Sequence, residues 1–173
     1  MTEIETYLER YYTSYVNSKS GDKSVDMSKE YDKLCDYFSE SGTLERQRLI
    51  NYLVYLEGIA TVITNRSMKI ENVDSLFGYR FFIGVNNPVV QDLELIPFGI
   101  HYRGIYWLYN EWVKYRKKEW KKAQNFIDSN DYNEWFIDTY EHYGVPLQNE
   151  ECALNRTDNF RTIVALHNEL RNR

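Results

Sequence analysis

The amino-acid sequence predicts an all-α fold, an irregular bundle of six to eight helices in a single domain. The chain has only three Pro and eight Gly in 173 residues, so few positions break a helix. Apolar residues recur at helical spacing, and strict apolar–polar alternation is scarce. The length and the 43% hydrophobic content fit one globular domain. We therefore expect residues 1–173 to form a single helical domain with its core at residues 43–128.

The N-terminal third predicts two helices joined by a polar loop. The first is expected over Thr2–Val16, because Thr2 is a suitable N-cap and acidic residues follow it in the first turn. The polar, glycine-containing stretch at about 17–25 is expected to be a flexible loop. The second helix is expected over Asp26–Ser39.

The third helix, predicted over Thr43–Asn65, should be the centre of the fold. Its apolar residues surround most of the helix, which is typical of a buried helix. A single carboxylate, Glu57, lies inside this apolar run. The apolar residues are Leu49, Ile50, Leu53, Val54, Leu56, Ile59, Ala60, Val62 and Ile63.

The rest of the chain predicts five more helices, with Pro88 at the first position of one of them. Gly99 and Gly104 weaken the beginning of the longest helix, so its start is expected nearer His101 than Pro97. A break near Lys122 is an alternative. The five predicted helices are Asn72–Val85, Pro88–Leu95, Pro97–Ser129, Tyr132–Tyr143 and Asp158–Leu170.

Charge divides the chain into acidic, basic and acidic parts. Residues 46–122 carry 12 Lys and Arg against seven Asp and Glu, whereas both flanking parts are acidic, and the whole chain has a net charge of −5. Five lysines within this basic part follow helical spacing and predict one basic stripe. They are Lys114, Lys117, Lys118, Lys121 and Lys122.

The basic stripe has two interpretations. It can bind the phosphates of a nucleic acid, with Trp120 stacking on a base. Alternatively, it is a solvated helix face or docks on the acidic N-terminal region. The acidic total disfavours a dedicated nucleic-acid-binding protein.

Glu57 and Arg80 both lie inside runs that otherwise look buried. A buried charge needs a partner, so we expect the two to form a buried polar pair that fixes helix register. The alternative is an enzyme in which Glu57, Arg80 and His101 line a pocket between helices.

Aromatic residues are in excess, with 16 Tyr, eight Phe and four Trp. A biased nucleotide composition of the coding sequence can explain this excess, but exposed aromatic residues also mark binding sites. We expect an aromatic binding surface around Trp107, Tyr109, Trp112 and Trp135. The leading hypothesis is thus a non-enzymatic intracellular protein-interaction or regulatory module that binds a protein partner or itself.

Common catalytic signatures are missing. The sequence contains no GxSxG, GxGxxG or P-loop motif, and its three histidines lack metal-ligand spacing, so we expect no catalytic residue, no metal and no cofactor. Cys35 and Cys152 are expected to be free thiols. The N-terminus lacks the features of a signal peptide, and the most apolar stretch is too short to cross a bilayer, which predicts a cytoplasmic protein.

The middle of the chain resembles an uncharacterised bacterial and prophage family of all-helical domains of unknown function. The resemblance covers residues 49–118, in the Leu49–Ile63 run, the Ile70–Phe82 segment and the Trp107–Lys118 helix. It implies an all-helical fold, suggests a phage or mobile element as a candidate origin, and transfers no activity. Members often carry membrane helices ahead of this region, which this sequence does not show.

Overall fold

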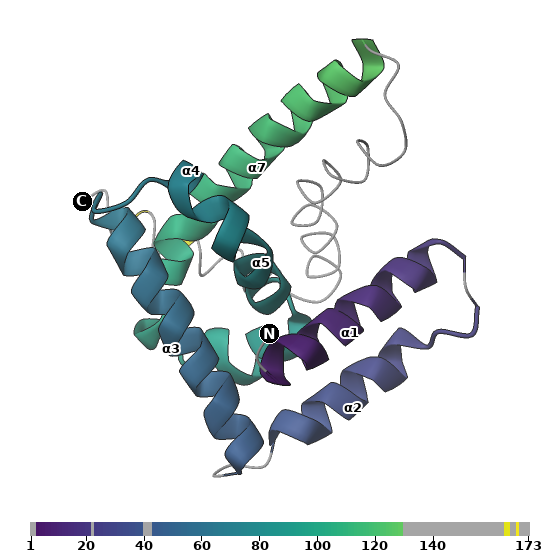
Figure 1. The fold of residues 1–173 in the computed structure, drawn as a ribbon. Helices are drawn as coiled ribbons and strands as arrows, with labels where there is room; N and C mark the ends of the chain where they lie inside the picture. Colours follow the sequence, from purple (N-terminus) through teal and green to yellow (C-terminus); the bar gives the residue numbers. More distant parts are fainter. Residues whose placement is uncertain (1–2, 22, 40–42, 130–164, 167–168, 170–173) are drawn as a thin grey trace.

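The computed structural model describes residues 3–21, 23–39, 43–129, 165–166 and 169 of the chain. These residues contain helices and no β-strand, which confirms the predicted all-α class. Figure 1 shows an irregular bundle whose helices cross at varied angles. The predicted helix at 132–143 lies outside the described residues, as does the one at 158–170 except for residues 165–166 and 169.

The two N-terminal helices form an antiparallel hairpin. Figure 1 shows α1 (Glu3–Lys19) and α2 (Met27–Ser39) lying side by side. The helix continues three residues past the predicted end at Val16. The predicted loop at 17–25 is therefore wrong over its first residues, and the connection begins after Lys19, where Gly21 adopts a positive φ of 93°.

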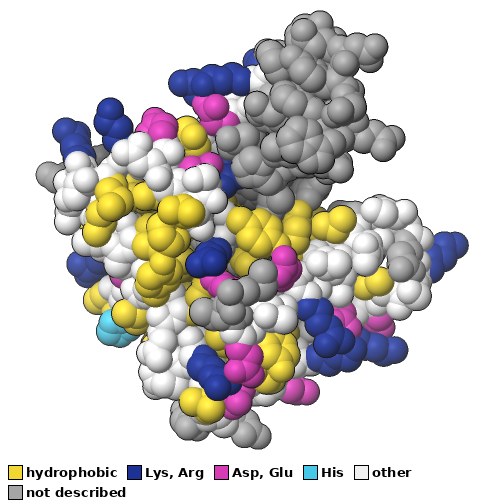
Figure 2. All heavy atoms as spheres, in the orientation of Figure 1, with side chains coloured by type: hydrophobic (Ala, Val, Ile, Leu, Met, Phe, Trp, Pro, Cys, Tyr) yellow, Lys and Arg dark blue, Asp and Glu magenta, His cyan; other side chains and the backbone are white. Residues whose placement is uncertain are grey.

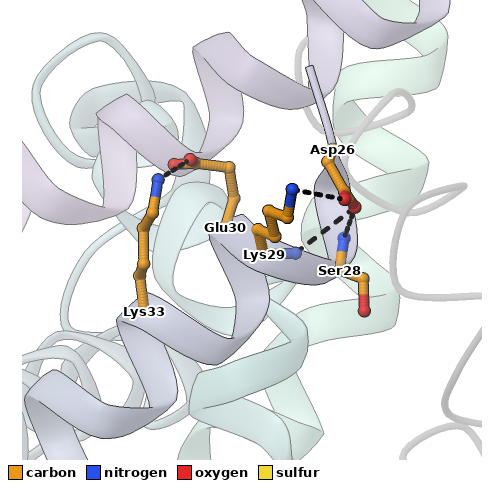
Figure 3. Close-up of polar contacts among 5 residues, drawn as sticks. All are labelled: Asp26, Ser28, Lys29, Glu30 and Lys33. Carbon is orange, nitrogen blue, oxygen red and sulfur yellow. Dashed lines mark hydrogen bonds and ion pairs between the residues drawn. The ribbon is translucent and has the colours of Figure 1, made fainter. Parts of the chain in front are cut away.

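Asp26 caps the start of α2 (Met27–Ser39), within one residue of the predicted start. Its Oδ1 accepts hydrogen bonds from the backbone amides of Ser28 at 3.1 Å and Lys29 at 3.4 Å (Figure 3). The Lys29 ammonium lies 3.6 Å from Oδ2 of Asp26, and Glu30 pairs with Lys33 at 2.7 Å. Exposed ion pairs such as the one between Asp26 and Lys29 add little stability, so the cap is what defines this end of the helix.

The central helix, α3 (Leu44–Thr64), has the predicted boundaries within one residue. The Thr43 hydroxyl accepts a hydrogen bond from the Arg46 amide at 3.3 Å, which makes it the N-cap. Local side-chain chemistry is sufficient to define this start, because cap and recipient are three residues apart.

The C-terminus of α3 ends in a Schellman motif. The Arg66 amide donates to the Ile63 carbonyl at 2.9 Å, and the Ser67 amide donates to the Val62 carbonyl at 3.0 Å. Arg66 occupies the left-handed position of this motif with a φ of 61°. Glycine is the usual residue at this position, because a side chain there costs roughly 1–2 kcal/mol.

Residues 70–85 form one helical segment interrupted by a π-helical turn. The order is α4 (Ile70–Val73), the π-helical turn η1 (Asp74–Gly78) and α5 (Tyr79–Val85). The segment begins two residues before the predicted start at Asn72, and the π-helical turn has no counterpart in the prediction. Such turns are rare and often accompany special contacts.

The next segment forms near its predicted bounds. It consists of α6 (Pro88–Val90) and the π-helical η2 (Gln91–Leu95), followed by the 3₁₀ turn η3 (Gly99–His101). The Asn87 side chain accepts hydrogen bonds from the first two amides after Pro88, at 3.0 and 3.3 Å. An Asn cap followed by Pro is a strong local signal for a helix start.

The longest helix, α7 (Arg103–Ser129), starts close to His101 as expected. It runs through Lys122 without the break that the sequence allowed. Figure 1 shows that its C-terminal half extends beyond α3 and α5.

The core forms where α3 and α7 pack against each other, with α5 packed against α1. It reaches beyond the predicted residues 43–128, because α1 and α2 also contribute fully or nearly fully buried side chains. Core residues of this kind are Leu8, Phe38, Leu49, Leu53, Leu56, Phe81, Phe82, Leu95, Ile105, Leu108 and Trp112.

Candidate functional site

The outer surface of α3 is apolar and exposed, which corrects the prediction that this helix is buried nearly all round. Val54 is 59% exposed, Tyr55 48% and Val62 39%. The helix is apolar on the side that packs against α7 and also on the opposite side. Sequence periodicity cannot distinguish these two sides when both are apolar. We call the exposed side the α3 outer face, and its residues are Val54, Tyr55, Gly58, Thr61 and Val62.

Gly58 lies in the middle of the α3 outer face. A Cβ atom added to it would meet nothing within 4 Å, so no described contact requires a glycine there. Glycine inside a helix costs about 1 kcal/mol relative to alanine. The neighbouring Thr61 hydroxyl donates to the Glu57 carbonyl at 2.8 Å, which satisfies its hydrogen bonding within the helix.

The apolar surface continues from α3 onto the π-helical turn. Tyr55 and Phe77 make an edge-to-face contact with ring centroids 6.0 Å apart, and Leu76 beside Phe77 is 65% exposed. Figure 2 shows hydrophobic side chains gathered over α3 and the adjoining helical segment. A contiguous apolar patch of this kind marks interaction surfaces more often than scattered single residues do.

The predicted aromatic surface does not form as expected. Trp112 is fully buried and Tyr109 is buried, so neither can contact a partner, whereas Trp107 is half-buried. The Trp112 ring packs against Phe81 with centroids 4.7 Å apart. Trp135 lies outside the described residues.

A buried ion pair lies under the π-helical turn. The Arg116 Nε lies 2.6 Å from Oδ1 of Asp74, and both side chains are at least 96% buried. The same carboxylate oxygen accepts a hydrogen bond from Trp112 Nε1 at 2.6 Å. The sequence carries one signal for this cluster, because Arg116 follows Trp112 by four residues and so shares its face of α7.

Glu57 and Arg80 do not pair, which corrects the predicted buried pair. The Glu57 carboxylate accepts hydrogen bonds from the amides of Gly104 at 2.7 Å and Ile105 at 2.9 Å. The carboxylate therefore accepts from two backbone amides at the N-terminus of α7 that have no partner within the helix. The helix dipole also favours an anion at this end. Burial raises the pKa of Glu57, and these two amide hydrogen bonds partly oppose the rise.

Arg80 instead binds the N-terminal helix. Its Nε lies 3.2 Å from Oε1 of Glu5, a residue that is buried on α1. The prediction that each charge within an apolar run finds a partner is thus correct, but the partners are different residues. Packing of α1 on α5 decides the partner of Arg80.

Glu57 and His101 line one cavity of about 680 Å³. The enzyme alternative predicts that these two residues and Arg80 share a pocket. Arg80 lines a different cavity, beside Glu5 and Tyr52. The second acid of the Glu57 cavity, Glu94, is neutralised by Arg46 at 2.6 Å. Both carboxylates are therefore held by structural contacts.

The half-buried Cys35 lies outside this cavity. Burial raises the pKa of its thiol, which disfavours the reactive thiolate.

The lysine stripe is exposed along α7, in agreement with the helical spacing. All five lysine side chains, Lys114, Lys117, Lys118, Lys121 and Lys122, are exposed. Lys122 pairs with Glu119 at 2.5 Å. The side chain of Trp120, the predicted stacking residue, lies outside the described atoms.

No family model, curated protein or solved structure matches the chain. The resemblance of residues 49–118 to a bacterial and prophage family therefore stays a prediction. The described residues contain no group of three or more His, Cys, Asp or Glu side chains that could hold a metal ion. None of the described helices has the length and apolar character needed to cross a membrane.

Proposed function

We propose that this protein is a non-enzymatic interaction module, and that the α3 outer face binds an amphipathic helix of a partner protein. The observation that carries this proposal is the exposed apolar face of α3 with Gly58 at its centre. Partner helices commonly place an apolar stripe against such a surface. The proposal keeps the function that the aromatic excess predicted and moves its site from α7 to α3.

The chemistry of the α3 outer face fits a helix better than a small ligand. Val54, Tyr55 and Val62 are exposed apolar residues on both sides of Gly58 along the helix, and Gly58 itself has no side chain. Packed helices approach to 8–10 Å depending on the side chains at the contact, and a glycine permits the closest approach. A glycine that costs stability in the free protein thus has a use in a complex.

Burial of the exposed side chains supplies the binding free energy. Full burial of one large aliphatic side chain contributes roughly 1.5–3 kcal/mol relative to the exposed state. The four exposed residues are Val54 (59%), Tyr55 (48%), Val62 (39%) and Leu76 (65%), so burial of each contributes only a part of that value, and this sum must exceed the cost of association.

The test is photo-crosslinking at the α3 outer face in cells that produce the protein. A photoreactive phenylalanine analogue at Val62 should crosslink a defined protein, and Gly58→Arg should abolish the crosslink by blocking the approach of a helix. Asn17→Arg is the matched control, because Asn17 is an exposed helical residue on α1. Sedimentation velocity of the purified protein separates self-association from a different partner. A crosslink that persists in the Gly58→Arg variant, or no crosslinked protein at all, contradicts the proposal.

A further inference from the structure

A groove of about 710 Å³ lies between the α3–α4 connection and the middle of α7. Four cationic side chains line it, two from each of these segments: Arg66 and Lys69 from the connection, and Lys114 and Lys118 from α7. Segments separated by more than forty residues thus bring positive charge to one concave surface. This convergence is not visible in the sequence, where only the lysines of α7 form a pattern.

Among the described residues, none forms an ion pair or a side-chain hydrogen bond with any of these four cations, whereas Arg46, Arg48, Arg80 and Arg116 are all paired. Two acids, Glu71 and Glu111, also line the groove, so its balance is positive. The exposed Lys117 and Lys121 continue the positive surface along α7.

Arg66 occupies a backbone position that favours glycine. Its φ of 61° belongs to the left-handed region of the motif that ends α3. Its side chain forms no described contact that compensates for the strain. Strained backbone positions of this kind cluster at binding and catalytic sites.

One half-buried aromatic ring and one exposed thioether accompany the cations. Tyr115 and Met68 line the same groove, and Met68 is 50% exposed. Positive grooves with aromatic groups bind single-stranded nucleic acids, because the phosphates contact the cations while the bases stack on the rings. Figure 2 shows Lys and Arg side chains along the edge where α3 ends and α7 extends outward.

We propose that this groove binds single-stranded nucleic acid, with phosphates on Arg66, Lys69, Lys114 and Lys118 and a base against Tyr115. The cations lie on two segments, so a strand that contacts all four crosses from the α3–α4 connection to α7. The site is separate from the α3 outer face, so it adds a second binding activity to the proposed interaction module. Its failure leaves the crosslinking test at Val62 unaffected.

The experiment measures fluorescence anisotropy of a labelled oligothymidylate and a labelled oligouridylate with the full chain at several salt concentrations. Four phosphate contacts predict a slope of about −3 in a plot of log affinity against log salt, since each contact on a single strand contributes about 0.7. Lys114→Glu combined with Lys118→Glu should weaken binding by tenfold or more, on the order expected for reversing two contacts. Lys23→Glu makes the same type of charge change at an exposed residue outside the groove and should leave binding nearly unchanged.

Arg66→Gly separates binding from folding. Because it relieves the left-handed strain, its melting temperature should equal or exceed that of the wild type. Its affinity for the oligonucleotide should fall, and its salt slope should become less negative by about 0.7. Unchanged affinity in this variant would exclude Arg66 from the site and overturn the proposed arrangement.

Three other results would overturn the proposal. The first is no binding at low salt. The second is equally tight binding of a duplex of the same sequence, which would remove the preference for a single strand. The third is displacement by polyglutamate at equal charge, which would identify an acidic protein segment as the ligand.

Discussion

At the scale of single residues, buried charges are paired with a specific opposite charge. Asp74 pairs with Arg116, Glu94 with Arg46 and Glu5 with Arg80. A charge removed from water is tolerated only when a partner and hydrogen bonds compensate for its lost hydration. The pairs connect α1 to α5, α3 to η2 and η1 to α7, so they act as specific links between elements.

The Asp74–Arg116 pair should be sensitive to truncation. Asp74→Ala leaves the Arg116 guanidinium buried and also removes the acceptor of Trp112 Nε1. We expect a loss of about 3–5 kcal/mol in the free energy of unfolding, measured by urea titration. Asp32→Ala, at an exposed acid of α2, is the control and should change stability by less than about 1 kcal/mol. Equal effects of both substitutions would show that the pair is unimportant for folding.

Glu57 should give the stability a specific pH dependence. Its folded-state pKa is raised above the ordinary value of 4.5 by burial, so the folded state binds a proton more tightly than the unfolded chain. The resulting stability is fully present below pH 4.5 and is lost as pH rises through the raised pKa. Relative to Glu57→Gln, the wild type should therefore become less stable with rising pH over this range. Chemical denaturation at several pH values measures the difference, and parallel curves for the two proteins would contradict it.

At the scale of elements, the π-helical turn η1 is explained by the contacts around Asp74. Gly78 lies against the Arg116 guanidinium, and an added Cβ would also lie 2.6 Å from Asp74 Oδ1. The widened turn and the missing side chain together let α7 approach this segment closely. The sequence showed a helix here but gave no periodic signal for an extra residue in one turn.

Two helical glycines should respond oppositely to alanine. Gly78→Ala forces the buried Asp74–Arg116 pair apart and should destabilise the fold by roughly 1–3 kcal/mol. Gly58→Ala adds a methyl group in open space and should stabilise it by up to about 1 kcal/mol. Thermal denaturation of both variants measures the two shifts. Shifts of the same sign would contradict the assignment of one glycine to packing and the other to a surface.

At the scale of the whole molecule, the links between elements predict cooperative unfolding. The buried residues of α1 and α2 belong to the same hydrophobic cluster as those of α3, α5 and α7. We expect one urea transition with coincident midpoints by far-ultraviolet circular dichroism and by tryptophan fluorescence. Arg80→Ala, which removes the link between α5 and Glu5, should lower both midpoints together. Separate transitions would show that the α1–α2 hairpin unfolds independently.

The sequence by itself determined the helical class and most helix boundaries. Thr43, Asp26 and the Asn87–Pro88 pair define helix starts through contacts that span at most three residues, so these signals act locally. Periodicity also placed the lysines of α7 on one exposed face. These features depend on spacing along one helix, which sequence reports directly.

Only the tertiary structure decided which partners meet and which apolar faces remain exposed. Glu57 contacts α7 instead of Arg80, Trp112 is buried against Phe81, and the α3 outer face faces solvent. The cationic groove likewise needs Arg66 and Lys118 to converge from different elements. The physical reason is that a helical pattern specifies the face of each side chain, whereas packing between distant segments determines what that face contacts.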